Sequence, residues 1–204
     1  MHTLTYHRES EIVKQLLDKD PLLEELFKHK ESITVRVSDR YFESLLDTII
    51  AQQLSGKVAS VISKRVFDYF EGDVKPELLL STPDENLRSL GLSYQKINYL
   101  KSLADCILTH KVDLLHLDRL SDQEVIDMLV QIKGIGVWTA QMFLMFSLGR
   151  EDVFSVGDLG LRNAVKRLYN NPELTHQAIE NIAEKWSPYR SIVSHFLWHA
   201  WDEK

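Results

Sequence analysis

Apolar residues recur every three or four positions along most of the chain, which is the period of an α-helix with one buried face. In the segment 38–54, SDRYFESLLDTIIAQQL, the apolar positions are Phe42, Leu45, Leu46, Ile49 and Ile50. The same spacing predicts helices in the segments 9–30, 57–70, 82–92, 93–111, 121–132, 137–149, 158–169, 175–186 and 189–201. The one plausible strand, ITVRVS at residues 33–38, is too short to form a sheet alone. We therefore predict an all-α fold of about nine or ten helices.

Capping residues mark the expected starts of several of these helices. Ser38 is a good N-cap for the segment that follows it, and Thr82 with Pro83 supplies a cap and a first helical residue. Ser121 has Glu124 three positions later, which is the pattern of a capping box.

The length of 204 residues suits one large domain or two small lobes. No fixed repeat is visible, and no apolar stretch reaches the roughly 20 residues of a membrane span. The first residues lack the basic-then-apolar layout of a signal peptide. We therefore expect a protein of the cytoplasm, or of the nucleus in a eukaryote, with no membrane partner.

The single cysteine and the histidines limit metal chemistry. Cys106 alone excludes an intrachain disulfide, a four-cysteine zinc site and a four-cysteine iron–sulfur cluster within this chain. We interpret Cys106 as a core residue rather than a nucleophile. His195 and His199 are four apart on a predicted helix and could bind a metal together, but no third ligand is evident, so we interpret both as structural or surface residues.

The net charge of −6 argues mildly against a nucleic-acid partner, although charge can be segregated on a surface. The basic residues near the motifs described next are Lys57, Lys64, Arg65, Lys133, Arg150, Arg162, Lys166 and Arg167.

The stretch QIKGIGVWTAQMF, residues 131–143, joins two apolar helices through a very tight link. Glycine at Gly134 and Gly136 permits positive φ and a close backbone approach. The second helix then presents N–H groups and the positive end of its dipole, which can grip a phosphate without reading sequence. A simple helix end followed by a tight turn is the alternative. Lys133, beside the hairpin, favours the phosphate interpretation.

Asp158 follows the hairpin by about twenty residues, directly before another helical pattern. It can serve simply as an N-cap. A carboxylate at a helix N-terminus also stays ionised, because N–H groups and the dipole stabilise the anion. An ionised carboxylate could stabilise positive charge that develops on a sugar.

Four segments together resemble the helix–hairpin–helix DNA glycosylases, and most closely the alkylbase branch, DNA-3-methyladenine glycosylase II. The match covers residues 38–201 and rests on IIAQQLSGKVASVISKRV, GLSYQKINYLKSLA, LVQIKGIGVWTAQMFLMFSLGREDVFSVGDLGLRNAV and WSPYRSIVSHFLWHAW. The superfamily signature is a helix–hairpin–helix, a Gly/Pro-rich stretch and an aspartate. Here the stretch is SVGD, which lacks the proline but keeps Gly157 and Asp158.

The resemblance implies a fold of two helical lobes with a central cleft. Residues from about 45 to 150 would form one lobe, with the hairpin at 132–137. Residues 1–44 and 151–204 would form the other. It also implies that Asp158 is the catalytic carboxylate.

The resemblance explains the tryptophan after the hairpin. Bifunctional members have a Schiff-base lysine two residues past the second hairpin glycine, where this sequence has Trp138, so a monofunctional enzyme is expected. An indole there would also attract a flipped cationic base, although core packing is an equal alternative. Met142 and Leu159 replace aromatic residues of some relatives, so we expect a base pocket of Trp138, Met142 and Leu159 that is less aromatic.

Other roles transfer from the family to matching positions. Gln53 in AQQLSG stands where relatives insert a wedge into the gap left by a flipped nucleotide; Leu54 is the neighbouring candidate or a core residue. Together with Gln53 and Leu54, the DNA-binding residues are expected to be Lys133, Gly134 and Gly136. The carbonyls expected to hold Na⁺ or K⁺ beside the hairpin belong to Val130, Ile132 and Ile135; no cofactor is expected to be required.

The expected function is therefore excision of alkylated purines from duplex DNA by a monomer without lyase activity. A glycosylase for deaminated or mismatched bases is one alternative. A non-catalytic DNA-binding module is the other, although an acid placed directly before a helix has no evident use in a pure binder.

Overall fold

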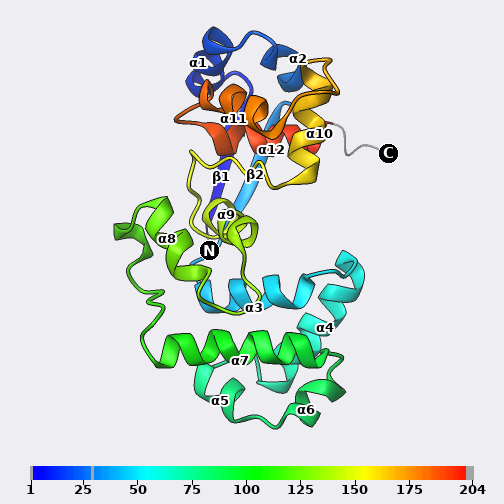
Figure 1. Cartoon of the computed structure of the whole chain (residues 1–204), viewed down its shortest axis with the longest axis vertical. Coiled ribbons are helices and arrows are strands. Elements are labelled where there is room, and N and C mark those ends of the chain that lie inside the picture. Colours follow the sequence, from blue (N-terminus) through cyan, green and yellow to red (C-terminus); the bar gives the residue numbers. More distant parts are fainter. Residues whose placement is uncertain (1, 29, 201–204) are drawn as a thin grey trace. The chain divides into compact units, whose positions relative to one another are not determined.

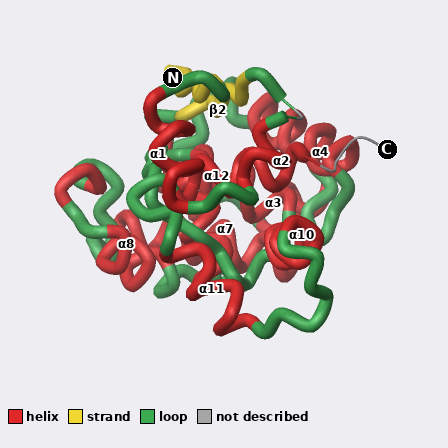
Figure 2. The backbone as a smooth tube through the Cα atoms, turned by 90° about the horizontal axis from the view of Figure 1, so that it is seen from above, coloured by secondary structure: helices red, strands yellow, loops and turns green. Residues whose placement is uncertain are grey.

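The computed structural model describes residues 2–28 and 30–200, and most of them are helical, as predicted (Figure 2). The helices are α1 (Glu11–Lys19), α2 (Leu23–Phe27), α3 (Tyr41–Ala51), α4 (Gly56–Tyr69), α5 (Pro76–Ser81), α6 (Asp84–Ser89), α7 (Tyr94–Leu108), α8 (Asp122–Leu129), α9 (Val137–Phe146), α10 (Leu159–Leu168), α11 (His176–Glu184) and α12 (Arg190–Ala200), with a 3₁₀ turn at Leu117–Arg119. Trp201, the last residue of the final predicted helix, lies outside the described residues. No helix in the described ranges is long and apolar enough to cross a membrane.

The contacts divide the chain into two compact units. One contains the described residues up to Val37 and from Leu144 onward, and the other is Ser38–Phe143. The boundaries expected from the sequence were near residues 45 and 150.

The Ser38–Phe143 unit is built around α7. Helices α3, α5 and α6 all pack against this helix (Figure 1). Leu100 and Leu103 of α7, Ile49 of α3 and Leu79 of α5 are all fully buried, in agreement with the packing of these helices. Cys106 is buried in α7, which agrees with its interpretation as a core residue.

The other unit combines helices with a two-stranded sheet that the sequence analysis did not predict. Strand β1 (His2–His7) pairs antiparallel with β2 (Ser32–Val37), and Leu4 lies opposite Val35. Alternate residues of β2 are buried, which is why its pattern was visible, but in β1 the one buried side chain is Tyr6. A strand with so little apolar alternation gives almost no signal.

Helix starts follow the capping predictions in part. Ser121 and Glu124 form the expected capping box of α8. Two expected caps are wrong by one or two residues: α3 has Arg40 at its N-cap position, and α6 has Pro83. Ser38 still contributes, because its hydroxyl accepts a hydrogen bond from the Arg40 N–H at 3.2 Å.

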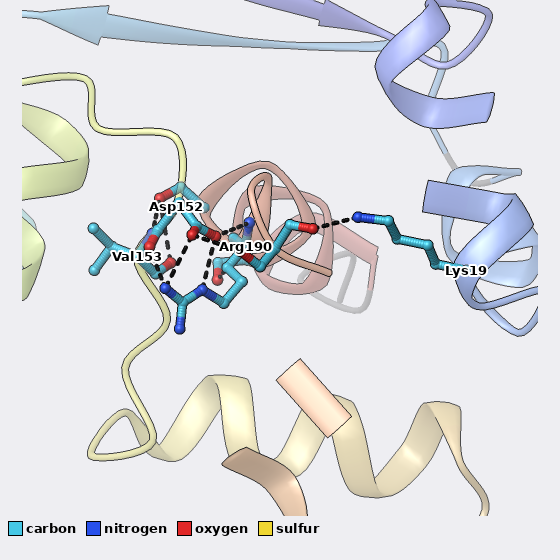
Figure 3. A network of polar contacts seen from close by, with 7 residues as sticks. Lys19, Asp152, Val153 and Arg190 are labelled. Carbon is cyan, nitrogen blue, oxygen red and sulfur yellow. Dashed lines mark hydrogen bonds and ion pairs between the residues drawn. The ribbon is translucent and has the colours of Figure 1, made fainter. Parts of the chain in front are cut away.

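An ion pair fixes the segment that precedes Asp158 (Figure 3). The Arg190 guanidinium donates to Asp152 Oδ1 at 2.7 Å and to Oδ2 at 3.1 Å, and the Ser187 hydroxyl donates to Oδ2 at 2.8 Å. Lys19 donates to the Ser187 carbonyl. Burial raises the pKa of Asp152, but the hydrogen bonds from Arg190 and Ser187 outweigh it and hold the pKa below its usual range.

We expect Asp152→Asn to lower the free energy of unfolding by about 1–3 kcal/mol at pH 7, because charge-assisted hydrogen bonds are lost. A carboxyl group whose pKa is lowered by folding stabilises the folded state at pH values above the pKa of the unfolded chain, which is about 3.9. This stabilisation disappears as the pH falls through the lower pKa of the folded protein. The difference between variant and parent should therefore shrink between pH 5 and pH 3. Urea unfolding followed by circular dichroism measures it.

Asp68→Asn is the matched control. Asp68 pairs with Lys64 one turn away on α4, where both side chains are exposed, and exposed pairs contribute about 0–1 kcal/mol. A deficit in Asp152→Asn that is equally large at pH 7 and pH 3 would contradict the assignment of this energy to the ionised carboxylate.

Candidate functional site

The hairpin between α8 and α9 turns at Gly134. Its φ is +87°, and a Cβ built there would lie 2.3 Å from Cδ2 of the Tyr99 ring. Both the left-handed backbone and the ring exclude a side chain. The hairpin is also fastened to α7 by the Lys133 N–H, which donates to the Ser102 hydroxyl at 3.1 Å.

Gly136 differs from Gly134, because the structure does not show the positive φ that was expected there. Its φ is not among the positive values, and a Cβ built on it meets nothing within 4 Å. Its carbonyl accepts the Ala140 N–H at 3.0 Å, so it stands directly before α9. Gly136 therefore leaves the N-terminus of α9 uncovered.

The start of α9 has the features of an anion site. A helix leaves its first N–H groups without partners inside the helix and carries the positive end of its dipole there. The exposed Lys133 side chain precedes this start by four residues. These features fit a phosphate, as the sequence analysis proposed.

The carbonyls expected to hold a monovalent cation belong to the end of α8 and the turn that follows it. Val130 is the C-cap residue of α8, where carbonyls lack donors inside the helix and the dipole favours a cation. The Ile132 carbonyl accepts the Ile135 N–H at 3.0 Å, which leaves a second lone pair. These oxygen donors suit Na⁺ or K⁺, and the cation stays a prediction.

The link between α3 and α4 presents Gln53. This residue is exposed and has a φ of +57°, a left-handed conformation that is uncommon for a residue other than glycine. Leu54 is half-buried, and its N–H donates to the Ala51 carbonyl at 3.1 Å. The exposed Gln53 therefore fits a wedge better than Leu54 does.

A cavity of about 610 Å³ lies within the Ser38–Phe143 unit, between this link, the hairpin and the start of α7. It is lined by Thr48, Ala51, Gln52, Gln53, Ser93, Gln95, Lys96, Tyr99, Gly134, Trp138 and Thr139. Trp138 is 44% exposed, so it is not a core residue. Met142, half-buried on the same helix, does not line this cavity.

Lys96 carries the one amine among the cavity-lining side chains. Its Nζ donates to the Ile50 carbonyl at 2.5 Å, in the last turn of α3. Partial burial lowers its pKa. No pattern in the sequence indicates a role for this lysine.

In the other unit, Asp158 is the N-cap residue of α10, as predicted. Its Oδ1 accepts the Leu161 N–H at 2.8 Å and the indole N–H of Trp198 at 3.1 Å. Gly160 has no side chain to crowd this group, since a Cβ there would lie 3.1 Å from the same oxygen. Leu159 is 62% exposed at the first position of α10.

Trp198 is a residue that sequence reasoning missed. It is half-buried on α12, and its ring lies 5.5 Å from Phe146 and 5.7 Å from His195 between centroids. The aromatic-rich run HFLWHAW could have drawn attention to Trp198. The sequence does not show, however, that Trp198 contacts Asp158, which lies 40 residues earlier in the chain.

The histidine pair gives no sign of metal binding. His195 is 4% exposed, and burial, with a smaller effect of His199, lowers its pKa to about 4. It is therefore a neutral packing residue near pH 7. Within the described ranges, no three His, Cys, Asp or Glu side chains group as a metal site.

Ser155 opens the SVGD stretch from which the signature proline is missing. Its side-chain oxygen is buried and has no hydrogen-bond partner among the described residues. A buried hydroxyl left unsatisfied is unfavourable.

Comparison with known families identifies the chain. Residues 46–188 match the HhH-GPD superfamily of base excision DNA repair proteins. The chain belongs to this family, and its helical fold, hairpin and helix-capping aspartate are in agreement with that membership.

Individual relatives are similar over most of their length. DNA-3-methyladenine glycosylase 1 of Schizosaccharomyces pombe is 35% identical over 162 residues, which covers 77% of this chain and 71% of that protein. The crystal structure of a DNA-3-methyladenine glycosidase from Bacillus halodurans has a TM-score of 0.88 at 37% identity, covering 97% and 92% of the two chains. The S. pombe 3-methyladenine DNA glycosylase in complex with abasic DNA has a TM-score of 0.78 at 30% identity, covering 93% and 95%.

The two hairpin glycines should respond differently to alanine. Gly134→Ala should lower the free energy of unfolding by more than about 2 kcal/mol, because a left-handed φ and a clash with Tyr99 act together. Gly136→Ala should cost less than about 1 kcal/mol, and it should weaken binding to undamaged and abasic duplexes alike, because a methyl group enters the space before α9. Thermal melting and fluorescence anisotropy measure the two effects.

Gly134→Ala is expected to act mainly on folding, and Gly136→Ala mainly on DNA binding. Each variant therefore serves as the control for the effect expected of the other. A well-folded Gly136→Ala protein with unchanged affinity for both duplexes would remove the hairpin from the binding site.

Proposed function

We propose that the protein excises alkylated purines of the 3-methyladenine and 7-methylguanine type from duplex DNA, leaving the free base and an abasic site. Membership of a base excision repair family supports glycosidic chemistry, and relatives named for 3-methyladenine support the substrate class. The single observation that carries the proposal is the Asp158 carboxylate, held at the start of α10 by two N–H donors.

Asp158 would act on the sugar. As the bond between C1′ and the base nitrogen breaks, its electrons leave with the base and positive charge develops on the ring. A fixed carboxylate stabilises that charge and helps orient the water that adds to C1′. The base is already cationic, so it departs neutral and needs no strong general acid. The indole N–H of Trp198 would set the carboxylate's direction, which makes Trp198 a positioning residue.

Trp138 would act on the base. A half-exposed indole offers a flat, electron-rich face, which favours a flipped cationic purine through stacking and cation–π attraction. Met142 and Leu159, the other expected pocket residues, are aliphatic, so shape rather than stacking would be their contribution.

The remaining residues would hold the DNA. The start of α9, with Gly136 and Lys133, would bind a phosphate, and Gln53 would fill the gap left by the flipped nucleotide. The Val130, Ile132 and Ile135 carbonyls would hold a monovalent cation, which would offset phosphate charge at the hairpin.

Methylated duplex DNA tests the reaction directly. We expect release of 3-methyladenine or 7-methylguanine, with strand breaks that arise only after heating, because Trp138 stands where lyases have an amine. Borohydride should trap no covalent adduct, since the amine of Lys96 is engaged with the Ile50 carbonyl. Release from hypoxanthine or uracil duplexes alone would assign another lesion class, and a borohydride-dependent adduct would establish lyase chemistry.

Asp158→Asn should abolish base release while it changes affinity for abasic DNA by less than about tenfold. The substitution keeps the size of the side chain and an oxygen for capping but loses the charge. Single-turnover release and anisotropy titration measure the two quantities, and a melting curve checks the fold. Turnover equal to the parent's would show that another group supports the sugar.

A further inference from the structure

Three contacts hold the Gln53 link and the hairpin in one arrangement. The Gln52 side-chain N–H donates to the Gly134 carbonyl at 2.8 Å, across 82 residues of sequence. On α7, Lys96 binds the Ile50 carbonyl just before the link, and the Tyr99 ring covers Gly134. All these residues belong to the same compact unit.

The contacts from α7 come from one side of that helix. Lys96, Tyr99 and Ser102 are spaced by three, so they lie on neighbouring turns. In order they reach the end of α3, the turn of the hairpin and the Lys133 N–H. Helix α7 packs against α3, so this side acts as a common base for both segments (Figure 1).

Gln53 needs such support, because its left-handed backbone is unfavourable for a residue with a side chain. Its neighbour Gln52 is half-buried, and its side-chain amide donates a hydrogen bond to the hairpin. The bond therefore joins the segment that would enter the DNA to the segment that would grip the phosphate.

We propose that Gln52 is a positioning residue, whose bond to the Gly134 carbonyl sets Gln53 relative to the hairpin and so couples phosphate binding to insertion of the wedge. This inference rests on the proposed function. It predicts that Gln52 acts through Gln53, and not on the phosphate grip or on folding in general.

A double-mutant cycle with Gln52→Met and Gln53→Ala tests this inference. Methionine keeps the length of the side chain and removes the N–H donor. The readouts are affinity for a duplex with a stable abasic analogue, affinity for the undamaged duplex, and the fluorescence of 2-aminopurine placed opposite the analogue, which reports unstacking. None of these requires base excision, so the cycle is informative even where methylated DNA releases no base and the proposed function fails.

We expect Gln52→Met to weaken abasic-DNA binding by about five- to tenfold, the size of one lost hydrogen bond. It should also lower the 2-aminopurine signal, with less than about twofold change on undamaged duplex. In the Gln53→Ala background the same substitution should have less than about twofold effect. Gln123→Met is the matched control, because the Gln123 amide bonds within α8 to Asp127 at 2.8 Å.

An undiminished effect of Gln52→Met in the Gln53→Ala background would overturn the inference, as would equal losses on both duplexes or no loss at all. Should Gln52→Met fail to fold, Gln52→Leu, which is uncharged and also lacks the N–H, takes its place in the cycle. Failure of both to fold would assign Gln52 to stability alone and also overturn the inference.

Discussion

The contact between the Tyr99 ring and Gly134 is the constraint on which this candidate site depends. The ring occupies the space of any side chain at position 134, and the backbone there is left-handed. Because the turn is fixed in this way, α9 starts at Val137, directly after Gly136. Trp138 therefore falls in the first turn of α9. The Gly134 carbonyl is aimed at Gln52 by the same turn. The proposed phosphate grip, base contact and wedge support would thus share one origin.

Asp158 shows how a structural and a chemical role can coincide. As the N-cap of α10 it accepts the Leu161 N–H, which fixes its backbone and one oxygen. The Trp198 indole adds a second donor from α12. Trp198 is itself oriented by packing on Phe146 and on His195, which burial keeps neutral near pH 7. The alternatives of cap and acid are therefore compatible, since capping orients the carboxylate that the reaction would use.

Sequence reasoning recovered what local patterns encode. The helical period, the capping box at Ser121 and the cap at Asp158 were predicted correctly, because each depends on residues three or four apart. Strand β1 was missed because its pairing with β2 defines it, while its own residues show little alternation between buried and exposed positions. Gln52, Lys96 and Trp198 were missed because their partners lie 82, 46 and 40 residues away. Glycine composition also could not separate Gly134, which is packed against a ring, from Gly136, which is open.

An acidic chain can bind a polyanion where its backbone supplies the positive potential. The net charge is −6, and several basic side chains are paired locally, as Lys64 is with Asp68 and Lys101 with Asp84. A helix N-terminus has no formal charge to count, yet it attracts a phosphate within its first turn. A phosphate would then be attracted at the hairpin, beside the exposed Lys133, although the chain as a whole is acidic. A negative net charge therefore does not argue against a nucleic-acid partner.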